Sequence, residues 1–175
     1  MTATFLPPTA TEYAPYYGTY IAKVPLGDLL ATLERQIGEI EATFGAMAPD
    51  RATFAYAPGK WSINEVIGHL SDAERVFSYR IVSFARNDPA SLPSFDENVW
   101  APEGRFNERS LASMVAELVA VRRASLALLD GLPAGTDTRQ GTASGKVVSV
   151  RALAYILCGH VAHHLGIVQE RYLTK

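Results

Sequence analysis

The chain has 175 residues, a net charge of −2, a hydrophobic fraction of 48% and one cysteine. This length predicts a single domain with a substantial core. The charge gives no reason to expect a surface for nucleic acid or for an anionic membrane. Because Cys158 is the only cysteine, no intramolecular disulfide can form. No apolar run reaches the roughly 18–20 residues that are needed to span a bilayer.

The first residues are rich in proline, threonine and tyrosine. They lack a basic segment followed by an apolar one, so we expect no signal peptide and a cytoplasmic location. Three prolines argue against an early helix. We expect a single domain over residues 1–175. Residues 1–24 are expected to form an ordered arm that packs on this domain, and this role is favoured over the alternative that the arm lines the entrance to a site. The tyrosines of this arm are Tyr13, Tyr16, Tyr17 and Tyr20.

Two amphipathic helices follow the arm. Leucine and isoleucine recur at helical spacing over residues 25–46, which predicts the first helix, and Pro49 then ends it. The second helix has a distinct start signal, because Ser62 with Glu65 fits a capping box. Its apolar period continues to about Arg86.

A long connection and two further helices make up the second half. Residues 88–106 contain three prolines and predict a loop. A third helix is expected to begin with Asn107 as its N-cap and to end with Gly131 as a C′ glycine.

Residues 134–148 predict a small hairpin that turns at Ser144-Gly145. Ser149 then caps a fourth helix, which reaches about Tyr172. Four long amphipathic segments predict an all-α fold, a four-helix bundle with a long crossover between helices two and three.

Histidines are the residues on which a functional prediction rests. His160 and His164 are four apart and share one face of the fourth helix, and His69 lies in the second helix. Because bundle sites are built from facing helices, we expect these three imidazoles to meet around one divalent metal ion. Three histidine ligands leave a coordination position open, as in catalytic sites.

Other readings remain open for these residues. A histidine in a bundle is more often an ordinary hydrogen-bonded residue than a ligand. His163 points away from the face shared by His160 and His164, which favours a packing role over a proton shuttle. Cys158 faces nearly opposite to His160, and a small buried apolar role suits it better than that of a nucleophile.

The zinc-protease signature is absent, because Val161 stands where the catalytic glutamate would follow the first histidine. Any general base must come from elsewhere. The candidates on the face of His69 are Asp72, placed slightly ahead, and Glu65, which its capping role already explains. Three neighbouring charges are expected to be surface or inter-helix charges: Glu74, Arg75 and Arg80.

Several segments, taken in order, resemble the DinB-like (DinB/YfiT) superfamily. They are YAPYYGTY (13–20), YAPGKWSI (56–63), GHLSDAER (68–75), RALAY (151–155) and GHVAHHL (159–165). The resemblance implies a four-helix bundle with up-down-down-up topology. It implies a divalent metal, zinc or nickel foremost, held at the motif positions His69, His160 and His164, and it implies a homodimer.

Characterised members of that superfamily include metal-dependent transferases and isomerases that use low-molecular-weight thiols. The first hypothesis is therefore a metal-dependent enzyme acting on a small molecule, either a thiol S-transferase or a hydrolase. In both reactions the metal would lower the pKa of the attacking group. The alternative is a non-catalytic small-molecule-binding or stress-response bundle whose metal is structural or absent.

Overall fold

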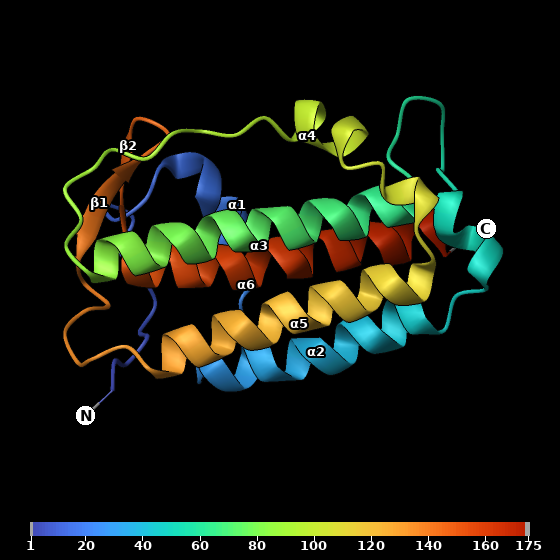
Figure 1. Cartoon of the computed structure of the whole chain (residues 1–175). Coiled ribbons are helices and arrows are strands. Elements are labelled where there is room, and N and C mark those ends of the chain that lie inside the picture. The colour runs from blue at the N-terminus through green and yellow to red at the C-terminus, as the bar shows by residue number, and fades with distance from the viewer. Residues whose placement is uncertain (1, 174–175) are drawn as a thin grey trace.

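The computed structural model describes residues 2–173 and shows a four-helix bundle (Figure 1). Its long helices are α2 (Leu29–Gly45), α3 (Ile63–Ala85), α5 (Leu111–Asp130) and α6 (Val150–Ile167). Each of these helices packs against two of the others, α3 against α5 and α6, and α2 against the same two. The expectation of one domain over 1–175 includes residues 1, 174 and 175, which lie outside the described residues.

Shorter elements surround the bundle. They are the 3-10 helices Pro15–Tyr17, Pro49–Thr53 and Phe106–Glu108, the helices α1 (Gly18–Ile21) and α4 (Glu97–Glu103), the strands β1 (Gln140–Ala143) and β2 (Lys146–Ser149), and a π-helical turn at Val168–Tyr172. In Figure 1 the hairpin lies at one end of the bundle, and the chain after α3 returns along the bundle to α4 before α5 begins. None of the helices in residues 2–173 combines the length and the apolar character needed to cross a membrane.

Helix starts follow the side chains that can satisfy free backbone amides. The predicted capping box of α3 is present, with Ser62 N donating to Glu65 Oε2 at 2.7 Å and Glu65 N to Ser62 Oγ at 3.2 Å. Ser149 caps α6, as expected. The first helix starts later than predicted, because Asp28 accepts from Leu30 N and Ala31 N.

The predicted start of α5 is wrong, whereas its predicted end at Gly131 is confirmed in position but not in conformation. Ser110, not Asn107, caps α5, because its hydroxyl accepts from Ser113 N. Asn107 instead accepts a hydrogen bond from Ser62 Oγ at 2.7 Å, which ties this connection to the start of α3. Gly131 ends α5 with a φ of −81°, so it is not in the left-handed conformation expected of a C′ glycine.

The predicted hairpin is present, with β1 and β2 antiparallel. Its turn residues, Ser144 and Gly145, have φ values of 53° and 71°. Two successive positive φ values are typical of the two-residue turns that match strand twist. The chain after α3 is joined to this hairpin, because Leu92 N donates to Thr142 O and Ser144 N donates to Leu92 O.

A buried polar layer divides the core into two apolar clusters. Arg122 donates through Nε and Nη2 to the carboxylate of Glu74 at 2.8 and 2.9 Å. Its Nη1 donates to Gln36 Oε1 at 2.5 Å, and Gln36 Nε2 donates to the carbonyl of Cys158. All four long helices contribute to this layer. The Glu74–Arg122 pair is an inter-helix contact, one of the two roles expected for Glu74.

The N-terminal arm contacts the start of α6 through Glu12. Glu12 receives Arg151 Nε and Nη2 at 2.7 and 2.6 Å and the hydroxyl of Ser149 at 2.7 Å. Hydrogen bonds from Arg151 are the main reason that the pKa of Glu12 falls from 4.5 to about 2, against the opposing effect of burial. The arm is thereby fixed to the start of α6.

Replacing Arg122 with methionine leaves the Glu74 carboxylate buried without its partner. We expect the free energy of unfolding to fall by about 3–5 kcal/mol, measured by urea denaturation. Arg35→Ala, which removes a solvent-exposed pair with Glu39, is the control and costs less than about 1 kcal/mol. Equal losses in the two variants would contradict the structural importance of this layer.

The Glu12 contact predicts a specific pH dependence. Because its folded pKa is lower than its unfolded pKa, ionised Glu12 stabilises the fold above pH 4.5, and this contribution is lost as the pH falls toward 2. The stability difference between wild type and Glu12→Gln should therefore shrink over that range in unfolding measurements. Glu41→Gln, on an exposed part of α2, serves as the control. A difference that does not change with pH would refute the assignment.

Candidate metal centre

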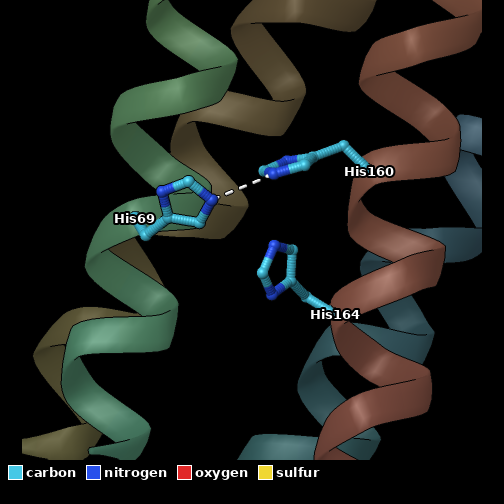
Figure 2. Close-up of side chains that lie close together, drawn as sticks. All are labelled: His69, His160 and His164. Atoms are coloured by element: carbon cyan, nitrogen blue, oxygen red, sulfur yellow. Dashed lines mark hydrogen bonds between the residues drawn. The ribbon is translucent and has the colours of Figure 1, made fainter. Parts of the chain in front are cut away.

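Three histidines converge between α3 and α6 (Figure 2). His69 comes from α3, and His160 and His164 from successive turns of α6. His69 Nε2 and His160 Nε2 are 3.0 Å apart, and one potential ligand nitrogen from each of the three rings lies within 4.8 Å of the others. The structure thus brings together the three residues that the sequence singled out as metal ligands.

Burial keeps these imidazoles neutral at physiological pH. It lowers the pKa of His69 to about 4 and that of His164 to about 3. The pKa of His160 lies well below 6.5, first because of burial and then because of the neighbouring histidines. Neutral imidazole is the form that binds metal, so protons compete little for this site near neutral pH.

The donor set fits a divalent metal ion. Two ligand nitrogens of a tetrahedral zinc ion lie about 3.3 Å apart, given Zn–N bonds of about 2.0–2.1 Å. The observed 3.0 Å between His69 and His160 is close to that separation. Without an ion, one of these nitrogens must carry the hydrogen that the other accepts. Three neutral nitrogen ligands suit zinc, nickel and other divalent metals.

A cavity of about 300 Å³ opens beside the histidines. Its walls are largely aromatic, and they come from the arm, α3 and the segment just before it, the chain between α3 and α5, the hairpin turn, and α6. Tyr20 stacks edge-on against His160 with ring centroids 5.3 Å apart, and Trp61 lies 4.8 Å from His69. The other aromatic residues of the lining are Tyr16, Tyr17, Phe77 and Phe95.

The arm therefore lines the site as well as packing on its own domain. Its approach depends on Gly159, because a Cβ at that position would lie 2.0 Å from the carbonyl oxygen of Tyr20. This glycine, next to His160 in sequence, lets the backbone of α1 press directly against α6. The tyrosine hydroxyls of Tyr16 and Tyr20 lie 2.9 Å apart at this edge.

His163 occupies the flank of the site. Its ring contacts Tyr20 at 5.3 Å and His164 at 5.1 Å, and it is partly exposed at the cavity wall. Burial lowers its pKa from 6.5. It is not among the three histidines whose ring nitrogens converge, and its packing role stays a prediction.

Neither predicted base faces this cavity. The carboxylate of Glu65 is held by the Ser62 amide in the capping box. Oδ1 of Asp72 lies 3.5 Å from Nη1 of Arg75. Asp72 borders a second, smaller void together with His69. Burial raises the pKa of the Asp72 carboxyl group. Their catalytic roles stay predictions.

Sequence reasoning missed the carboxylate that does line the cavity, Glu97 in α4. Its charge acts on His69, since it raises the pKa of that ring against the larger effect of burial. The predicted loop 88–106 contained the signal for α4, because Asp96 accepts from Asn98 N as an N-cap. Pro102, inside the helix, obscured it.

Two other expected roles can be compared with the structure. Cys158 is buried, and burial raises the pKa of its thiol to about 11, so it does not act as a thiolate near neutral pH. Arg80, expected among surface or inter-helix charges, is buried and lines the cavity.

Comparisons with known proteins agree with this architecture. A search of curated protein sequences gave no match. Among solved structures, one match is described as "YfiT from Bacillus subtilis is a probable metal-dependent hydrolase with an unusual four-helix bundle topology". It shares 16% sequence identity, with a TM-score of 0.72, and the alignment covers 95% of this chain and 91% of that one.

At this identity the match establishes a shared fold. The sequence itself gives the family, because the profile described as the DinB superfamily matches residues 32–168, a range that includes all three converging histidines. The chain belongs to the DinB superfamily.

Proposed function

We propose that this protein is a divalent-metal-dependent enzyme that acts on a small molecule, with hydrolysis as its reaction. One observation carries the proposal: three neutral imidazoles converge at the wall of an aromatic cavity of about 300 Å³. A purely structural metal would be enclosed by four protein ligands. Here the described residues supply three, and the cavity lies beside them.

His69, His160 and His164 would hold the ion, zinc or nickel foremost. A bound divalent metal supplies Lewis acidity, which lowers the pKa of an attacking water or thiol and polarises the substrate. The remaining work falls to the chain. The aromatic walls hold the apolar part of a substrate and exclude bulk water.

Glu97 is our candidate for the proton acceptor. Among residues 2–173 it is the carboxylate that lines the same cavity as the histidines. Its position on α4, which packs against α3, places its charge near His69. A carboxylate at the cavity wall can take a proton from an attacking water and return it to the leaving group.

Transfer of a low-molecular-weight thiol to an electrophile is the second candidate. The same three imidazoles favour it, because a divalent metal held by them at the cavity wall would also lower the pKa of a thiol that enters the cavity. This reaction would depend less on Glu97. A thiol whose pKa is lowered by a bound metal is already ionised near neutral pH, so it needs no carboxylate to accept its proton. The requirement for thiol therefore separates the two reactions.

Metal content tests the site directly. Wild-type protein without an affinity tag, reconstituted with zinc or nickel and dialysed, should retain about one equivalent by mass spectrometry. His164→Ala should lose it, because two histidines bind weakly, whereas His163→Ala, one residue away, should keep it. Equal metal content in the two variants, or none in wild type, would refute the site.

Catalysis can be measured with a model ester, 4-nitrophenyl acetate, and with a model electrophile, monobromobimane plus L-cysteine. For hydrolysis, Glu97→Gln should lower kcat by about 10²–10⁴-fold at unchanged metal content. Glu65→Gln and Asp72→Asn should have small effects, because neither carboxylate lines the cavity. Protein-dependent consumption of bimane only with thiol, and no ester hydrolysis, would favour the transferase.

A further inference from the structure

Arg80 has a buried charge without an opposite charge beside it. The residue is 3% exposed. Its Nη2 donates to the carbonyl of Pro93 at 2.8 Å and to Ser144 Oγ at 3.0 Å. Within residues 2–173, no carboxylate lies within 4.0 Å of it, and Nε and Nη1 have no hydrogen-bond acceptor there.

The other buried arginine, Arg122, differs in this respect, and so does Arg151, which is partly buried. Arg122 is fully buried and pairs with Glu74, and Arg151 pairs with Glu12. Both use Nε and Nη2 to hold a carboxylate. Removing a guanidinium from water is costly unless an anion compensates for it. Arg80 therefore lacks a partner of the kind that its counterparts have.

Its side chain reaches the cavity beside the histidines. Arg80 follows His69 by eleven residues on α3, which is about 20° from a whole number of turns, so both lie on one helix face. Their Cα atoms are separated by about 16 Å along the axis. The wall of the cavity therefore extends over about three turns of α3 between the two residues.

The fold holds this guanidinium in place from two directions. Pro93 belongs to the chain after α3, and Ser144 belongs to the hairpin turn. Those two segments are joined at Leu92 by backbone hydrogen bonds to Thr142 and Ser144. A side chain fixed in this way, with unused donors at a cavity wall, is arranged to bind an anion.

We propose that Arg80 binds a carboxylate on the substrate, so that the cavity selects molecules with a reactive group at one end and a carboxylate at the other. The part of this inference that places a reactive group at the histidines rests on the proposed function. The binding of a carboxylate by Arg80 does not. A monoanion matches the site, because one guanidinium is present and Glu97 lines the same cavity. A phosphate dianion would be repelled more strongly by that carboxylate.

The test compares ligands of one shape and different charge. Calorimetry would measure binding of 4-phenylbutyrate, of the neutral 4-phenylbutyramide and of 3-phenylpropyl phosphate to the full chain, with zinc and without it. Wild type should bind the acid about tenfold or more tightly than the amide, also without zinc. The phosphate should bind no better than the acid.

Variants assign that preference to one residue. Arg80→Met should remove it, and Arg80→Lys should keep part of it. Arg75→Met, which removes an exposed arginine of the same helix, should leave it unchanged. His164→Ala should also keep it while losing metal, so failure of the metal site and failure of this inference give different results.

Several outcomes would overturn the inference. They are equal affinity for acid and amide in wild type, tighter binding of the phosphate, and a preference that persists in Arg80→Met or appears only with zinc. The last would mean that the carboxylate binds the metal. Circular dichroism would show whether Arg80→Met folds. If it does not, the NMR signal of the Arg80 Nε–H in wild type replaces it as the test. That signal must shift when the acid is added and not when the amide is added.

Discussion

The layer formed by Gln36, Glu74, Arg122 and the Cys158 carbonyl sets the register of the bundle. Apolar side chains can slide past one another at small cost, whereas a buried ion pair with a hydrogen-bonded amide fits in one alignment only. The layer contains one group from each long helix. Because Cys158 precedes His160 by two residues, fixing its carbonyl also fixes the height at which His160 faces His69.

The sequence was most informative where one local interaction decides the structure. Spacing placed His160 and His164 on one face, and the Ser62 capping box set the start of α3 to the residue. It was least informative where distant segments meet. Nothing near Arg80 in sequence indicates that Pro93 and Ser144 will enclose it. Similarly, Asn107 resembled a helix cap, but Ser62 binds it.

The described cavity is chemically asymmetric. Neutral imidazoles occupy one part of its wall, a guanidinium held by Pro93 and Ser144 occupies another, and aromatic rings make up much of the rest. The two short strands, which contribute little to the apolar core, thus have a clear role in the architecture: they support Arg80 beside α3. The arm has the matching role on the other side, because Gly159 allows the backbone at Tyr20 to close against α6.

The lining of the cavity extends from Tyr16 to His164 and so involves nearly the whole length of the chain. Contacts between segments so far apart in sequence form late, since each requires the closure of a long loop. During synthesis, His69 would leave the ribosome about ninety residues before His160. The complete set of three histidines is therefore available to a metal ion only after His160 and His164 have been synthesised and α6 has packed against α3.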